Sequence, residues 1–197
     1  GLWLRYNLKS AISRAEWDEL KTDTLPKLTG KLYAGIKFST DGTSCALAVA
    51  CRTKDNAIFV EAIGCHPTRD GSGWLLDFLS KADLAAVAVD GASGQQLLAD
   101  AMKAAHLRSP VLPTVKQVIT ANAAFEQALF AQALCHAGQP GLAQAASNCE
   151  KRAIGSNGGF GYRSLTEGGH IELLDSVILA HWQCAEGKGK RRQRIRY

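Results

Sequence analysis

The chain has 197 residues, 46% of them hydrophobic and 21% charged, and a formal net charge of +5 at neutral pH. A chain of this length and apolar content can build one domain with a substantial core, with or without an arm. No stretch approaches the roughly 18 uninterrupted apolar residues of a membrane span, and the first residues do not follow the order of a signal peptide. These features exclude a membrane-spanning protein, and we expect a soluble, intracellular protein that is not secreted.

The basic charge is concentrated at the carboxyl terminus. Residues 188–197 contain six basic side chains and no acidic one, whereas the rest of the chain has 17 Lys and Arg against 18 Asp and Glu. Such a tail suits a phosphate backbone, because each neutralised phosphate releases counterions. A solubilising or disordered end is the alternative. The predicted nucleic-acid contacts in the tail are Lys188, Lys190, Arg191, Arg192, Arg194 and Arg196.

The first part of the chain is expected to be an arm or linker followed by an antiparallel sheet. Residues 1–30 contain a short helix near Ala15 to Leu20 and then a turn around Pro26 and Gly30. Apolar runs separated by the turn-forming segments 41–42 and 54–56 then predict a three-stranded meander. Its strands are Leu32 to Phe38, Thr43 to Arg52 and Ala57 to Gly64.

The next part alternates between helix and strand. We predict a helix over 74–81, a strand over 84–90, a helix over 93–106 and a strand near 111–115. This spacing favours parallel strands joined by right-handed crossovers.

The last part is mainly helical and includes one hairpin. A helix over 120–136 has Thr120 or Asn122 as its N-cap, His136 near its carboxyl end and Gly138 as its stop. A short helix over 139–146, a hairpin of strands 150–154 and 160–165, and a helix from Ile171 follow. No Gly-x-x-x-x-Gly-Lys-Ser/Thr motif is present, so we do not expect the chain to hydrolyse ATP by itself.

This order of elements predicts an α/β fold of the RNase H-like class. It has a mixed central sheet, with three antiparallel strands and then parallel strands, flanked by helices and extended by a β-hairpin. In that arrangement the first and fourth strands are neighbours about 4.8 Å apart, so side chains at their matching ends can share a site.

Two carboxylates stand at informative places in this pattern. Asp90 ends the buried strand 84–90, and Asp175 lies on the otherwise apolar face of the last helix. A carboxylate on a packing face needs hydrogen bonds, a cation or a proton, because uncompensated desolvation costs several kcal/mol. Two acids at the ends of neighbouring elements suggest a divalent metal site.

The six cysteines do not form any Cys-x-x-Cys pair, and the five histidines show no metal-ligand spacing. Most cysteines lie within apolar segments, where free thiols pack as small hydrophobic groups. We therefore predict buried thiols rather than disulfides or a zinc site, and we expect His181 to be a packing or surface residue.

Four motifs resemble the nuclease domain of phage terminase large subunits, the motor proteins that package viral DNA. They are the strand Tyr33 to Ser39, the strand Val87 to Asp90, the stretch His136 to Pro140 followed by Ser147 to Cys149, and the helix Leu174 to Ala180. The opening Leu4 to Leu8, with Trp17, is similar to the segment that joins the ATPase domain of this family to its nuclease. The resemblance implies that residues 1–30 are a linker from an absent ATPase domain, that 31–187 are the nuclease domain and that 188–197 are a basic tail.

The resemblance also implies an activity and a setting. Such domains cut concatemeric double-stranded DNA with two Mg²⁺ or Mn²⁺ ions held by an acidic cluster, and Asp90 and Asp175 match two of its ligands. By the same resemblance, the partners are double-stranded DNA, the terminase small subunit and the portal, without a membrane. The expected location is the cytoplasm of the infected bacterial host.

Lys37 departs from the family pattern, which has an aspartate at this position of the first strand. Strand alternation directs Lys37 away from the side of Ile36 and Phe38 and toward the expected site. An ammonium about 4 Å from a divalent ion would be repelled by about 8 kcal/mol at an effective dielectric constant of 20.

Three explanations of Lys37 remain open. Asp41 could supply the missing carboxylate, or Lys37 could contact the scissile phosphate and leave a one-metal enzyme. Alternatively, the domain could be a catalytically weakened module for DNA binding or motor docking. Glu61 and Glu172 are reserve ligands, ranked below Asp41. A RuvC-like junction-resolving nuclease of the same fold is a further alternative.

Three basic residues of the predicted hairpin complete the candidate site. Lys151, Arg152 and Arg163 flank the turn and are predicted to contact DNA beside the acids, although hairpin charges commonly serve only solubility.

Overall fold

The computed structural model of the chain describes residues 9–156 and 158–187. The similarity at Leu4 to Leu8 and the predicted contacts of the basic tail therefore lie outside the described residues. None of the helices in the described parts of the chain is both long and apolar enough to cross a membrane.

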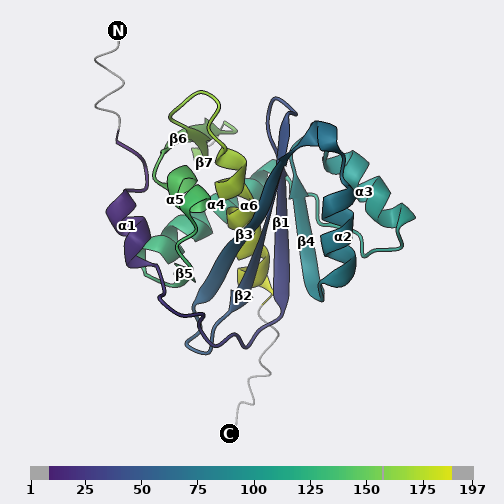
Figure 1. The fold of residues 1–197 in the computed structure, drawn as a ribbon. Coiled ribbons are helices and arrows are strands. Elements are labelled where there is room, and N and C mark those ends of the chain that lie inside the picture. Colours follow the sequence, from purple (N-terminus) through teal and green to yellow (C-terminus); the bar gives the residue numbers. More distant parts are fainter. Residues whose placement is uncertain (1–8, 157, 188–197) are drawn as a thin grey trace, which may run out of the picture.

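A five-stranded mixed sheet forms the centre of the molecule (Figure 1), in the order β4-β1-β2-β3-β5. The first three strands form the predicted antiparallel meander, and β4 and β5 add in parallel to β1 and β3. The strands are β1 (Leu32–Phe38), β2 (Ser44–Arg52), β3 (Ile58–Pro67), β4 (Leu84–Asp90) and β5 (Leu134–His136). The predicted neighbourhood of the first and fourth strands is confirmed.

Helices cover both faces of this sheet. One apolar cluster joins one sheet face to α1, α4, α5 and α6, and a second joins the other face to α2 and α3. The helices are α1 (Arg14–Glu19), α2 (Gly73–Lys81), α3 (Gln95–Ala104), α4 (Val115–Phe130), α5 (Pro140–Ala146) and α6 (Ile171–Glu186). The predicted hairpin is also present, as β6 (Cys149–Ile154) and β7 (Gly159–Ser164).

Close packing at Gly35 positions the last helix on the first strand. A Cβ atom at Gly35 would lie 2.2 Å from the backbone oxygen of Ser176 and 2.5 Å from the backbone nitrogen of Ala180. Only a residue without a side chain allows this approach. The contact holds the second and third turns of α6 over the middle of β1, so Asp175, in the second turn, lies close to this strand.

Replacing Gly35 with alanine is therefore expected to lower the free energy of unfolding by about 2–3 kcal/mol, because the added methyl group meets backbone atoms. Gly73 is a matched control, since an added Cβ there meets nothing within 4 Å. Urea denaturation followed by circular dichroism measures both variants. Equal stabilities for Gly35→Ala and Gly73→Ala would contradict the packing argument.

The predicted strand over 111–115 is wrong. Val111 forms only an isolated parallel bridge with Ala88, and α4 already begins at Val115. Thr114 caps α4, because its hydroxyl accepts from the backbone of Gln117 while the Gln117 side chain accepts from the backbone of Thr114. This capping box starts the helix five residues earlier than the expected Thr120.

The predicted end of that helix is also wrong. α4 ends at Phe130, after which Gln132 adopts a left-handed φ of 52° and Ala133 donates to the backbone oxygen of Ala128. The chain then forms β5, so His136 does not cap a helix. Instead it is buried, stacks on Trp17 with ring centres 4.2 Å apart, and its Nε2 donates to the Trp17 backbone oxygen at 2.7 Å.

Candidate active site

Lys37 and Asp90 form an ion pair at the carboxyl ends of two adjacent parallel strands. They are register partners at the end of the β1–β4 ladder, and Lys37 Nζ lies 2.6 Å from Asp90 Oδ2. Their side chains are only 16% and 18% exposed, so solvent screens the pair weakly. The lysine therefore points toward the α6 side of the sheet, as strand alternation predicts, and neutralises one of the two candidate acids.

Asp175 is a second carboxylate beside this pair, but it is not compensated in the same way. Within the described residues, it has no hydrogen-bond donor and no salt bridge. Burial raises the pKa of Asp175 to about 6, and the negative charges of Asp90 and Glu172 add to this effect. The positive charges of Lys37 and Arg152 oppose the rise only in part. The site thus holds a partly buried acid that would gain from a cation.

Asp41 lies on the rim of the same site. A cavity of about 270 Å³ is lined by Lys37, Asp41, Glu172 and Asp175, among others. The Oδ1 atom of Asp41 accepts from the Ser39 hydroxyl at 2.7 Å and from the hydroxyl and backbone N–H of Thr43 at 2.8 and 3.0 Å. These bonds hold the pKa of Asp41 at about 2, so this exposed carboxylate stays ionised. Its Oδ2 atom has no partner among the described residues.

The two reserve ligands have different positions. Glu172 lies one helical turn before Asp175, is only 3% exposed and lines the cavity. Its Oε1 atom accepts from the Ser44 hydroxyl and lies 2.9 Å from His170 Nδ1 and 3.7 Å from Cys65 Sγ. Glu61 does not line this cavity. Glu172 was ranked below Asp41, yet it is the more deeply buried acid of the site, and Ser44, Cys65 and His170 were not among the predicted site residues.

The β6–β7 hairpin lies on the other side of Asp90 and Asp175. A small cavity of about 20 Å³ lies between Arg152 and Tyr162 of the hairpin and the three residues Lys37, Asp90 and Asp175. Arg152 is exposed and has no ion pair within the described residues. The other two predicted DNA contacts are already paired.

Lys151 and Arg163 make these pairs. Lys151 Nζ lies 2.5 Å from Glu126 Oε2 and 4.3 Å from the ring centre of Phe160, and Arg163 Nε lies 2.6 Å from Glu150 Oε1. Arg152 is therefore the hairpin cation that is free to face a ligand beside the acids.

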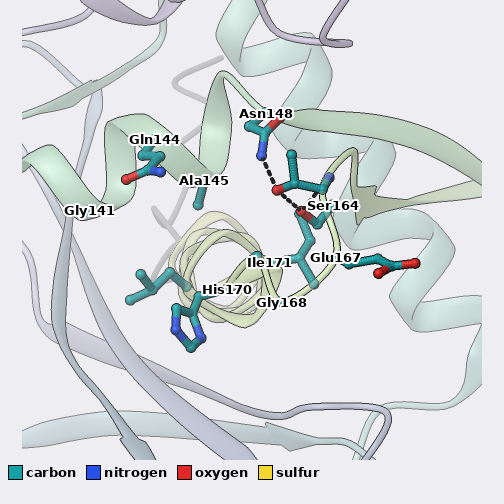
Figure 2. Close-up of a pocket in the computed structure, with 12 residues that line it drawn as sticks. Gly141, Gln144, Ala145, Asn148, Ser164, Glu167, Gly168, His170 and Ile171 are labelled. Atoms are coloured by element: carbon teal, nitrogen blue, oxygen red, sulfur yellow. Dashed lines mark hydrogen bonds between the residues drawn. The ribbon is translucent and has the colours of Figure 1, made fainter. Parts of the chain in front are cut away.

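The loop that leads into α6 also lines a second cavity, of about 330 Å³, whose lining residues are drawn in Figure 2. Gly168, Gly169, His170 and Ile171 line both cavities. Figure 2 shows His170 on the opposite side of α6 from Asn148 and Ser164, whose side chains bond to Thr166. Small shifts of this loop would consequently alter the wall of both cavities.

The residues present do not fit a two-metal centre built from three carboxylates. Across the described ranges, the one group of three metal-ligating side chains whose ligand atoms lie within 4.8 Å of one another is Cys65, His170 and Glu172. The Lys37 ammonium, which is paired with Asp90, would also repel a second divalent ion at the end of β1. The uncompensated carboxylate of Asp175, with Asp90 beside it, fits a single divalent cation.

The strand order and the long helix packed across β1 define an RNase H-like fold, as the sequence predicts. No protein-family model matches the sequence, and no curated protein is significantly similar to it. Solved structures with this fold are similar to the chain.

The large terminase of bacteriophage HK97 aligns with a TM-score of 0.67 and 17% identity over 88% of this chain and 43% of that chain. The large terminase nuclease of the thermophilic phage G20c aligns with a TM-score of 0.58 and 17% identity over 89% of this chain and 99% of that chain. The nuclease domain of the Thermus phage P74-26 large terminase gives a TM-score of 0.55 and 16% identity. The chain thus spans less than half of the HK97 protein and nearly the whole of the isolated nucleases.

Proposed function

We propose that this chain is the nuclease domain of a viral DNA-packaging terminase and that it cuts double-stranded, concatemeric DNA with a divalent cation. The observation that carries the proposal is the uncompensated carboxylate of Asp175 beside the Lys37–Asp90 pair, where β1 and β4 end. The shared fold of three terminase structures supports the choice of family. Residues 31–187 would form the nuclease, and residues 1–30 would link it to an ATPase domain.

The cation proposed for this site is Mg²⁺ or Mn²⁺. The G20c nuclease has been solved with bound magnesium and with bound cobalt, and the nuclease domain of the Sf6 large terminase subunit with manganese. Asp175 and Asp90 would hold one ion. The uncommitted oxygen of Asp41 would be the third ligand after the three carboxylates move together, because their ligand atoms do not all lie within 4.8 Å of one another in the described residues. When bound, such an ion polarises the scissile phosphate and lowers the pKa of a bound water.

Positively charged side chains would bind the DNA phosphates and stabilise the charge that develops during cleavage. Lys37 would stand in for a second cation, because its ammonium can stabilise the charge that develops on the phosphate. Arg152 would bind the DNA backbone at the hairpin, with weaker contributions from Lys151 and Arg163. The basic tail would add phosphate contacts of its own.

Cleavage of supercoiled plasmid tests this function directly. We expect the 197-residue chain to nick and linearise the plasmid with Mn²⁺ or Mg²⁺ and to leave it intact with EDTA. DNA binding without cutting would instead favour a DNA-binding or motor-docking module. Preferential cutting of branched over linear duplex would favour a junction-resolving nuclease.

The terminase small subunit and the portal are the further partners that this family implies, and the cytoplasm of an infected bacterium is the proposed location. Both follow from the proposed family, and neither would hold if the chain belonged to another family.

Replacing Arg152 with alanine is expected to weaken binding to duplex DNA by roughly five- to tenfold and to reduce the slope of log affinity against log salt by about 1, because one phosphate contact is lost. Arg163→Ala is the matched control, since Arg163 is paired with Glu150. Fluorescence anisotropy over a salt series measures both. Equal losses in the two variants would show that Arg152 has no special place at the interface.

A further inference from the structure

Glu172 is a buried carboxylate whose neighbours are unusual. Within the described residues it has no lysine or arginine partner, and the groups around it are the hydroxyl of Ser44, the imidazole of His170 and the thiol of Cys65. All three act on the same oxygen, Oε1, while Oε2 has no described partner. A carboxylate that is only 3% exposed needs compensation for its lost hydration, and a cation would supply it.

The three ligand atoms have the spacing of a metal site. Cys65 Sγ lies 4.0 Å from His170 Nδ1 and 3.7 Å from Glu172 Oε1, and His170 Nδ1 lies 2.9 Å from Glu172 Oε1. Zinc bonds of about 2.0–2.3 Å place tetrahedral neighbours roughly 3.3–3.6 Å apart. Each observed separation is therefore within about half an ångström of this range, and small side-chain rotations would suffice to reach it.

The chemistry of the donors selects the kind of cation. A sulfur, an imidazole nitrogen and a carboxylate oxygen suit Zn²⁺ and similar borderline ions, whereas Mg²⁺ prefers oxygen ligands alone. The helix amino terminus at His170 carries a partial positive charge, but the carboxylate and a thiolate together outweigh it. The exposed ring of His170 and the cavity beside Glu172 leave room for a fourth ligand.

We propose that Cys65, His170 and Glu172 form a site for a divalent cation of the zinc class, with a fourth position open to the cavity that Asp175 also lines. This site is distinct from the one proposed at Asp90 and Asp175, and it does not rest on the proposed nuclease activity.

The fold explains why residues so distant in sequence meet. β3 continues beyond Gly64, so that Cys65 pairs with Ala46 of β2 and comes to the end of the sheet. His170 and Glu172 begin α6 at the same end. Ser44, at the start of β2, orients the carboxylate by donating to it. Such outer partners tune the affinity of metal sites.

Binding would replace a proton on sulfur. Burial, together with the charge of Glu172, raises the pKa of Cys65 to about 12, so the thiol is protonated in the metal-free protein. The cation would form its bond to the thiolate while the thiol proton is released to solvent, as is usual when cysteine ligates a metal.

A cobalt titration of the 197-residue chain tests the proposal, with absorbance as the readout. Co²⁺ occupies zinc sites, and we expect it to give a sulfur-to-cobalt charge-transfer band together with the visible bands of a four-coordinate ion. Cys65→Ser is expected to remove the charge-transfer band. His170→Gln is expected to weaken binding by more than about 100-fold, and Ser44→Ala by about tenfold as an outer partner.

Two controls make the result specific. Cys45 is a neighbouring buried cysteine outside the cluster, so Cys45→Ser should keep the band. Asp175→Asn should also keep it, which separates this site from the proposed nuclease centre. Absence of the band in the parent, or its survival in Cys65→Ser, would overturn the proposal. Because His170 is 63% exposed, His170→Gln should fold normally, and unchanged cobalt affinity in that variant would overturn it as well.

Discussion

Replacing Asp175 with asparagine is expected to abolish DNA cleavage and at the same time to stabilise the metal-free protein at pH 7.5. Burial raises the pKa of Asp175 from 3.8 to about 6, so keeping this group ionised in the folded state costs about 2–3 kcal/mol. Asparagine removes that cost without changing the shape of the side chain. The expected gain is therefore about 2–3 kcal/mol in the free energy of unfolding.

The pH dependence of this gain follows from the direction of the shift. Because the folded protein holds the proton more tightly than the unfolded chain, the contribution of Asp175 to stability falls as pH rises from about 4 to about 6 and is constant above. Below about pH 3 both states are largely protonated, and the difference between the variant and the parent should disappear. Urea denaturation in EDTA at about pH 3 and at pH 7.5 approaches both limits.

Asp90→Asn is a control for which we expect the opposite change in the free energy of unfolding. Asp90→Asn removes the partner of Lys37 and should destabilise the protein, whereas Asp175→Asn should stabilise it. A loss of stability in Asp175→Asn at pH 7.5 would contradict the view that this carboxylate is uncompensated.

Replacing Lys37 with aspartate is expected to make the stability of the protein depend on metal. The substitution breaks a pair that is more than 80% buried on both sides and places three carboxylates together. Without metal, we expect a loss of about 2–4 kcal/mol. A divalent cation should then restore about 2.7 kcal/mol when present at 100 times its dissociation constant.

Lys37→Met separates the two effects of this change, because it breaks the pair with Asp90 without adding a carboxylate. Thermal unfolding with EDTA, Mg²⁺ or Mn²⁺ should show the largest metal-dependent rise in the melting temperature of Lys37→Asp and a smaller rise in Lys37→Met, which keeps only Asp90 and Asp175 as ligands. If Lys37→Asp gained no more from metal than the parent does, Lys37 would not stand at a cation position.

The strands were predictable where the sequence pattern is local. The apolar run of β1 and the Asp41-Gly42 turn define the meander, and its boundaries agree with the structure to within three residues. The region around α4 was less predictable. Its capping box begins directly after Pro113, and its end depends on Gln132, a non-glycine residue in the left-handed region. A helix end of this kind has no strong sequence signal.

The site residues also differ in whether local sequence or tertiary structure determines their position. Asp90 and Asp175 are marked by a strand end and by an apolar helix face, and strand alternation gives the direction of Lys37. The cluster of Cys65, His170 and Glu172 depends on β3 running past Gly64 and on the place where α6 begins. These are tertiary facts, and the spacing of cysteines and histidines along the chain does not contain them.

Plasmid cleavage by the parent and by Asp175→Asn, side by side in Mn²⁺, tests the central claim most directly. The account predicts that the parent nicks the plasmid, that EDTA stops it, and that the folded, more stable Asp175→Asn variant has lost at least about 100-fold in rate, since it lacks a ligand of the ion that activates water. Equal cutting by the two proteins, or no cutting by a parent that binds the DNA, would contradict it.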